Sequence, residues 1–121
     1  MKNNNEDSTR YYSDIQEKSV CKALNGIQNP NSGAAHFKKG DVVQRDASLL
    51  IECKTVMSSK ESISIKKNWI EKNKEEAASS KLFYNCIAFN FGPKEDNYYI
   101  IDEKLMKFLV EKLIEDNKTW L

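Results

Sequence analysis

Glu52 and Lys54 form a pair of residues that could do chemistry. They lie within a run of branched apolar residues. Residues spaced two apart in a β-strand point to the same face, and the residues beside them point to the other. The apolar residues 49–51 predict that this strand is buried, and a buried glutamate and lysine need partners. A surface hairpin carrying an ordinary Glu–Lys pair is the simpler alternative.

Asp41 is expected to face Glu52 across a hairpin. The sequence predicts a short strand over 40–44, a two-residue turn at Asp46-Ala47 and a longer strand over 48–56. Counting outward from this turn places Asp41 directly opposite Glu52, with their Cβ atoms about 4.5–5.5 Å apart.

Two opposed carboxylates repel and destabilise a sheet, unless a cation lies between them. Mg²⁺ prefers oxygen ligands and takes one or two carboxylates, with water and phosphate oxygens in its remaining positions. A lysine beside such an ion can hold a water or neutralise charge on a phosphate. Asp41, Glu52 and Lys54 are thus the residue types needed for metal-assisted phosphodiester hydrolysis, with Mg²⁺ as the expected cofactor and Mn²⁺ as its substitute.

A helix over about 14–25 is expected to precede this hairpin. Ser13 and Gln16 match a capping box at its start, and Gly26 is a plausible stop. The apolar residues of this helix share one face with Glu17, an unusual place for a fully solvated glutamate. Segment 1–12 is expected to be disordered or partly ordered, and 13–121 to form a single domain.

Helices and strands alternate after the hairpin. A helix is expected from about 64 to 80, a strand over 82–91, a strand over 97–101 and a helix over 103–116. The predicted inner faces consist of Ile65, Trp69 and Ala77 in the first of these helices, and of Leu105, Phe108, Leu109 and Leu113 in the second. The expected fold class is α/β (α+β), a mixed sheet flanked by helices in the order α-β-β-α-β-β-α.

The composition fits a soluble protein of one domain. The chain has 121 residues, no apolar run long enough to cross a bilayer and no apolar stretch typical of a signal peptide at its start, so we expect an intracellular location. Three widely spaced cysteines disfavour a disulfide framework or a zinc cluster. The net charge is only +1, but 36–74 carries nine Lys or Arg against five acids. This segment would be cationic with a metal bound, although an ordinary solvated surface explains the lysines as well.

The order of these residues resembles the core of the PD-(D/E)XK nucleases. Gly40-Asp41-Val42, a hairpin and Leu50-Ile51-Glu52-Cys53-Lys54 stand where that family has its D…ExK motif, with Gly40 in place of the usual proline. Archaeal Holliday-junction resolvases and small phage-encoded nucleases are similar over about 13–91. They also carry a glutamate on the first helix, a Ser-Gly loop and a helix after the lysine strand, matched here by Glu17, Ser32-Gly33 and 63–69.

The resemblance implies a role for each matched residue. Asp41 and Glu52 would be metal ligands, joined by the backbone carbonyl of Cys53, and Lys54 would be the catalytic lysine. Glu17 would complete the metal shell directly or through water, with an ordinary helix-surface glutamate as the alternative. Candidate DNA contacts are Ser32, Lys38, Lys39, Lys66 and Lys67. The alternative is a simple turn residue for Ser32 and an ordinary solvated side chain for each lysine.

The implied activity is metal-dependent DNA cleavage. Resemblance suggests a Holliday-junction resolvase acting on branched DNA as a homodimer, with the last helix or segment 82–91 as possible interfaces. A nuclease of the same fold acting on other DNA (nicking, repair or restriction type), a non-catalytic nucleic-acid-binding module and a small protein-interaction domain remain alternatives. The lysine- and asparagine-rich composition is compatible with a phage or mobile element.

Overall fold

The computed structural model describes residues 4–28 and 41–120 of the chain. Within those ranges it contains three helices and one five-stranded mixed sheet, in the order α1-β1-β2-β3-α2-β4-β5-α3. The mixed class of helices and strands expected from the sequence is confirmed. The expected order was wrong in one respect, because it lacked β1 (Ile27–Gln28), a two-residue strand too short to give a sequence pattern.

The strands lie across the sheet in chain order, from β1 to β5. The four longer strands are β2 (Asp41–Gln44), β3 (Leu49–Lys54), β4 (Tyr84–Phe89) and β5 (Tyr98–Ile100). Among the described strands, only β3 and β4 pair in parallel; every other neighbouring pair is antiparallel. A parallel pair needs a crossover connection, which α2 (Lys67–Ser79) supplies.

The β2–β3 hairpin has the register predicted from the sequence. Asp41 is the partner of Glu52, and the ladder closes at Gln44 and Leu49. The backbone N–H of Ser48 donates to the carbonyl of Arg45 at 3.0 Å, closing the turn. Ser48 itself has a φ of 55°, so the left-handed residue follows the central turn residues rather than lying among them.

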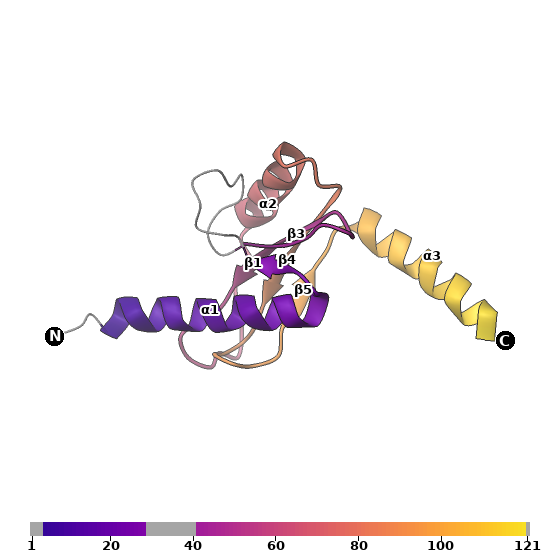
Figure 1. Cartoon of the computed structure of the whole chain (residues 1–121). Helices are drawn as coiled ribbons and strands as arrows, with labels where there is room; N and C mark the ends of the chain where they lie inside the picture. The colour runs from indigo at the N-terminus through magenta and orange to yellow at the C-terminus, as the bar shows by residue number, and fades with distance from the viewer. Residues whose placement is uncertain (1–3, 29–40, 121) are drawn as a thin grey trace.

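The helix α1 (Asn4–Leu24) packs along one face of the sheet (Figure 1). Its Val20 is fully buried in a cluster with Val42 and Ile51 of the hairpin. The helix begins at Asn4 rather than at Asp14, so the predicted capping box at Ser13 was wrong and that residue lies inside the helix.

The end of α1 is where the sequence placed it, at Gly26. The backbone N–H of Gly26 donates to the Cys21 carbonyl at 3.0 Å, and Asn25 adopts a left-handed φ of 55°. A Cβ at Gly26 would come within 2.7 Å of a Val42 methyl, so a glycine permits this close approach to β2.

The opposite face of the sheet is covered by α2 (Figure 1). Ala77 is buried against Val43 and Leu50, as its predicted inward position requires. The helix begins at Lys67 rather than near 64, because Lys66 is still extended, with φ −84° and ψ 133°. Ile65 therefore precedes the helix and is exposed, so its predicted place on the inner face was wrong.

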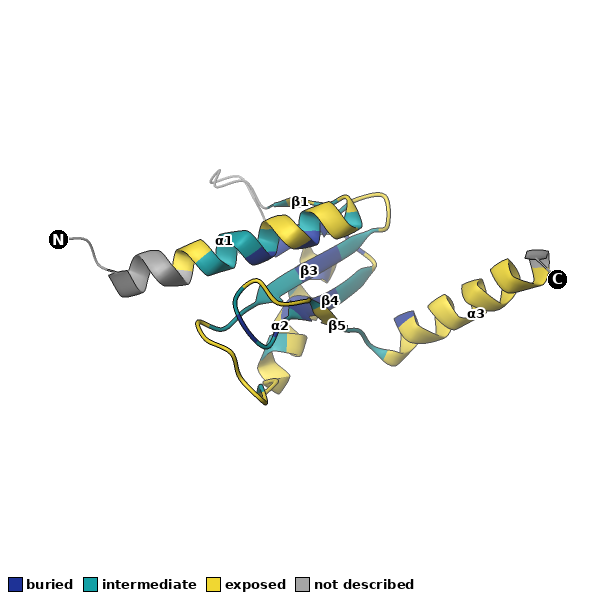
Figure 2. Ribbon diagram, turned by 90° about the horizontal axis from the view of Figure 1, so that it is seen from below, coloured by how far each residue is buried: buried dark blue, intermediate teal, exposed yellow. Residues whose placement is uncertain are grey.

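The last helix, α3 (Glu103–Trp120), extends away from the sheet, and Figure 2 shows most of it exposed. Its predicted inner face was wrong beyond Leu105, which is buried: Phe108, Leu109 and Leu113 are 42%, 41% and 61% exposed. Phe108 stacks on Tyr84 of β4 with ring centroids 6.1 Å apart. Among the described helices, none is long and apolar enough to cross a membrane.

Candidate active site

The first feature of the candidate site is the pair of carboxylates at the open end of the hairpin. Asp41 begins β2 and lies directly opposite Glu52 in β3. Both residues share a sheet face with Val43 and Leu50, because side chains alternate along a strand. That face is the one covered by α2, since Val43 and Leu50 pack against Ala77. Asp41 is only 2% exposed, so its carboxylate is withdrawn from bulk water.

Lys54 lies on the same face, two residues beyond Glu52. Its Nζ atom is 3.1 Å from Oε2 of Glu52, and its side chain is 35% exposed against 13% for Glu52. The same Nζ lies 4.7 Å from the centroid of the Trp69 ring, in the first turn of α2. The ammonium group is therefore held between a carboxylate and an aromatic face, both of which favour its positive charge.

Gln16 fixes the backbone of Lys54 from the opposite side of the sheet. This residue is 3% exposed, and its Nε2 donates to the Lys54 carbonyl at 2.9 Å. The same nitrogen lies 3.3 Å from the Ala88 carbonyl in β4 and 3.3 Å from Oδ1 of Asn97. One buried amide thus ties α1 to the ends of β3 and β4. The sequence interpretation had assigned Gln16 to a helix cap, which was wrong because the helix begins much earlier.

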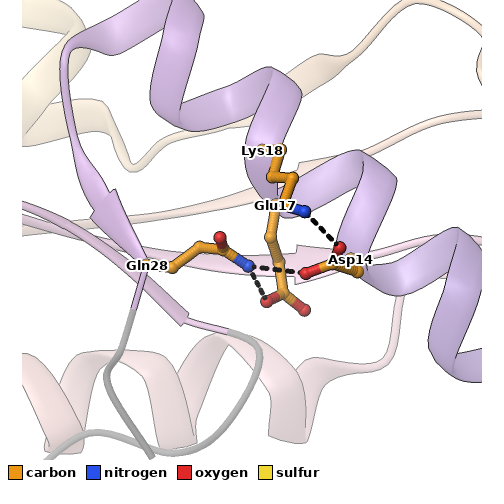
Figure 3. Close-up of polar contacts among 4 residues, drawn as sticks. All are labelled: Asp14, Glu17, Lys18 and Gln28. Atoms are coloured by element: carbon orange, nitrogen blue, oxygen red, sulfur yellow. Dashed lines mark hydrogen bonds and ion pairs between the residues drawn. The ribbon is translucent and has the colours of Figure 1, made fainter.

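Glu17 lies on the α1 side of the sheet, in a polar cluster with Asp14 and Gln28 (Figure 3). The side-chain amide of Gln28 donates to Glu17 Oε1 at 3.0 Å and to Asp14 Oδ1 at 3.1 Å, and Lys18 pairs with Asp14 at 2.9 Å. Burial raises the pKa of Glu17, although the hydrogen bond from Gln28 opposes that rise. Glu17 is half-buried, in agreement with its place on the apolar face of the helix, and its carboxylate accepts the hydrogen bond from Gln28.

The sheet separates Glu17 from the hairpin carboxylates. Gln28 is the partner of Val42, which belongs to the core beneath α1, whereas Asp41 points to the α2 face. In the part of the chain that the structure describes, no three His, Cys, Asp or Glu side chains gather in a group able to hold a metal. Metal binding by Glu17 stays a prediction.

Cys53 points toward α1 and packs against the core cluster. Burial raises its thiol pKa strongly, and the negative charges of Glu17 and Asp41 add to that rise. The thiol is therefore protonated and unreactive at neutral pH. In the sheet Cys53 is paired with Ala88 of β4 and lies beyond the last described pair of β2 and β3. Metal binding by its carbonyl stays a prediction.

The predicted DNA contacts fall into two groups. Lys66 and Lys67 are exposed at the start of α2, and Lys66 Nζ lies 6.0 Å from the Trp69 centroid. They are therefore on the same side of the sheet as Lys54. Ser32, Lys38 and Lys39 lie outside the described residues.

A divalent cation fits the pair at the hairpin in number and type of ligand. Mg²⁺ sites commonly use one or two carboxylates and complete the octahedron with water and phosphate oxygens. Asp41 and Glu52 supply two carboxylates on adjacent strands, and Lys54 adds a cation that can face a phosphate. This arrangement is suited to phosphodiester chemistry and not to nucleophilic catalysis by a thiol.

The sequence interpretation missed two residues at this site. Gln16 appeared as a helix cap, and Trp69 appeared only as an inward apolar residue. The position of Trp69 near Lys54 could have been predicted, because Trp69 lies in the helix that follows the lysine strand and a crossover helix must cover that strand. Nothing in the local sequence of Gln16 indicates a contact with Lys54, since the two residues are 38 positions apart.

No family model, curated protein or solved structure matches this chain.

Proposed function

We propose that the chain is a metal-dependent DNA endonuclease of the PD-(D/E)XK type that acts on branched DNA such as Holliday junctions. One observation carries the proposal: Asp41 faces Glu52 across the hairpin while Lys54 lies on the same face, 3.1 Å from Glu52. The junction preference rests on the sequence resemblance alone.

Each residue of this trio has a distinct task in the proposed reaction. A bound Mg²⁺ would supply Lewis-acid activation of the phosphodiester and of the attacking water. Asp41 and Glu52 would hold that ion at the end of the sheet. Lys54 would orient the water or neutralise charge that develops on the phosphate, and its ammonium is already directed by Glu52 and Trp69. Gln16 would keep the Lys54 backbone in place.

Two alternative functions are a nuclease with another DNA substrate and a binding module without catalytic activity. A nuclease of the same type acting on nicked or linear DNA would use the same trio. A non-catalytic nucleic-acid-binding module would need neither the opposed carboxylates nor the lysine beside them. The arrangement of Asp41, Glu52 and Lys54 favours the catalytic alternatives, because metal-assisted hydrolysis uses carboxylates and a lysine on one face, whereas a binding module does not.

Cleavage of a labelled four-way junction beside a linear duplex of the same sequence tests the proposal. Each substrate is incubated with Mg²⁺, Mn²⁺ or EDTA and with wild-type, Glu52→Gln or Lys54→Ala protein. Glu75→Gln, a change on the exposed surface of α2, is the matched control. We expect metal-dependent nicking of the junction that is lost in both site variants and kept in the control.

Other outcomes are equally informative. Cutting of both substrates would keep the nuclease and discard the junction preference. Cleavage that survives in Glu52→Gln and Lys54→Ala would contradict the site. Absence of cleavage with any metal would leave a binding module as the better account.

A homodimer formed through α3 is a further part of the proposal. The helix exposes an apolar stripe beyond Leu105, in which Met106, Leu113 and Ile114 are 52%, 61% and 50% exposed. Exposed apolar surface of this kind is typical of protein interfaces. Sedimentation equilibrium should give a dimer for wild-type protein and a monomer for the double variant Met106→Lys, Leu113→Lys. A monomeric wild-type protein would contradict this assignment.

A further inference from the structure

An aromatic cluster lies beside the candidate site on the same face of the sheet. Phe89 of β4 is the parallel partner of Lys54, and Tyr98 of β5 is the antiparallel partner of Phe89. Partners on adjacent strands share a face, so Lys54, Phe89 and Tyr98 form a row across the sheet. Neighbouring strands are about 4.8 Å apart, which puts the backbone of Tyr98 roughly 10 Å from the backbone of Lys54.

The ring of Tyr98 is both exposed and fixed in direction. It is 53% exposed, whereas Phe89 and Phe91 are half-buried. Its centroid lies 5.9 Å from that of Phe89 and 5.8 Å from that of Phe91, and the Phe91 ring meets it edge-on at 71°. Phe89 and Phe91 also meet edge-on, with centroids 5.6 Å apart. Two partly buried rings thus support a third that remains open to solvent.

The positive charge next to this cluster comes from Lys54, at one end of the row, whose Nζ atom also lies 3.1 Å from Glu52 Oε2. Lys60 is joined to the cluster through its backbone, whose N–H donates to the Phe91 carbonyl at 2.7 Å. Glu95, in the loop between Phe91 and Tyr98, accepts a hydrogen bond from the Ser59 hydroxyl at 2.7 Å. An aromatic face next to lysines is the combination that binds single-stranded nucleic acid, because bases stack on the ring while phosphates meet the cations.

We propose that Tyr98, supported by Phe89 and Phe91, stacks against one unpaired nucleobase of the strand whose phosphate lies at Lys54. This inference rests on the proposed function, since it names the substrate as DNA with an unpaired nucleotide beside the cleaved bond. A base within a paired duplex must first be unstacked and unpaired, which costs free energy, so the cluster favours DNA that already offers an unpaired base.

Tyr99 provides a matched control on the same strand. It is the partner of Ala88, which belongs to the core beneath α1, so its ring points to the other face of the sheet. Burial raises the pKa of Tyr99, and the nearby thiols of Cys86 and Cys53 add to the rise, in agreement with that position. Tyr98 and Tyr99 therefore differ in the face they occupy and not in residue type or strand.

Fluorescence anisotropy with a labelled oligothymidylate in EDTA tests the inference without any cleavage. Tyr98→Leu should weaken binding by about 5- to 100-fold, Tyr98→Phe should stay within about twofold of wild type, and Tyr99→Leu should have no effect. Circular dichroism of each variant checks its fold. A Tyr98→Leu protein that binds as wild type, an equal loss in Tyr99→Leu, or a wild-type protein that does not bind the oligonucleotide would each overturn the proposal.

The same variants separate this inference from the nuclease itself. Binding that depends on Tyr98 in a protein that never cleaves DNA would support the stacking site and discard the nuclease. Cleavage of the junction with binding indifferent to Tyr98 would keep the nuclease and discard the stacking site.

Discussion

Replacing Gln16 should expose how strongly one buried amide holds the end of the Lys54 strand. In Gln16→Met the side chain keeps its length and loses its donor, so the contacts to the Lys54 and Ala88 carbonyls disappear. A buried hydrogen bond contributes about 1 kcal/mol net, and a buried acceptor left without a partner costs about 1–3 kcal/mol. The Oε1 atom of Gln16 is itself buried without a partner, and removing it offsets part of the loss. We expect a net loss of about 1–3 kcal/mol in the free energy of unfolding.

Gln16→Glu is the sharper test, because it replaces the donor by an acceptor of the same shape. A buried, unpaired carboxylate facing two carbonyls should cost about 3–5 kcal/mol near pH 8. Burial raises the folded-state pKa of such a carboxyl above its unfolded value. The folded state then binds the proton more tightly, so stability is lost as the pH rises through the folded pKa and regained as the pH falls. A neutral carboxyl also offers one O–H donor in place of the lost N–H.

Urea unfolding followed by circular dichroism at pH 5 and pH 8 measures both effects. The penalty of Gln16→Glu should shrink markedly at pH 5, and that of Gln16→Met should not change with pH. A cost below about 0.5 kcal/mol for Gln16→Met, or a Gln16→Glu protein whose stability does not depend on pH, would refute the role given to this amide.

Three further predictions concern residues around the site. Trp69→Leu removes the aromatic face over the Lys54 ammonium and should lower kcat with little change in KM. Trp69→Phe keeps an aromatic ring and should recover most of the activity. Equal losses of activity in both variants would refute the role of this contact. Burial raises the pKa of Cys86 to about 12 and that of Cys53 still higher, so neither thiol should react with Ellman's reagent at pH 8 before unfolding. Burial also raises the pKa of Glu17, so the folded state favours the protonated carboxyl and loses stability as the pH rises through that pKa. Glu17→Gln should therefore stabilise the protein by under about 1 kcal/mol at pH 7 and not at pH 4, as measured by urea unfolding. Destabilisation by this variant at pH 7 would contradict the prediction.

The sequence predicted those parts of the fold that depend on local patterns. The opposition of Asp41 and Glu52 followed from the length of one turn and the two-residue period of strands, and the structure confirms it. The stop of α1 beside Gly26 was also predicted, although the residue with the left-handed conformation there is Asn25. Both features are set by residues close together in the chain.

The misplaced features depend on contacts between distant segments or on weak local signals. The start of α1 was misplaced because Ser13 and Gln16 imitate a cap, although the helix continues through them. The apolar pattern of α3 was read as packing against the sheet, yet a pattern shows which residues share a face and not what that face meets. The contact between Gln16 of α1 and Lys54 of β3 joins residues that are 38 positions apart in the chain, and no local rule predicts it.

Calorimetric titration with Mn²⁺ tests the central claim most directly, because it measures metal binding at the hairpin without any DNA. We expect wild-type protein to bind the ion, Glu52→Gln to lose most of that binding, and Glu75→Gln to bind as wild type. Retention of Mn²⁺ binding in Glu52→Gln, or no binding by the wild-type protein with or without a DNA junction, would contradict a metal site between Asp41 and Glu52.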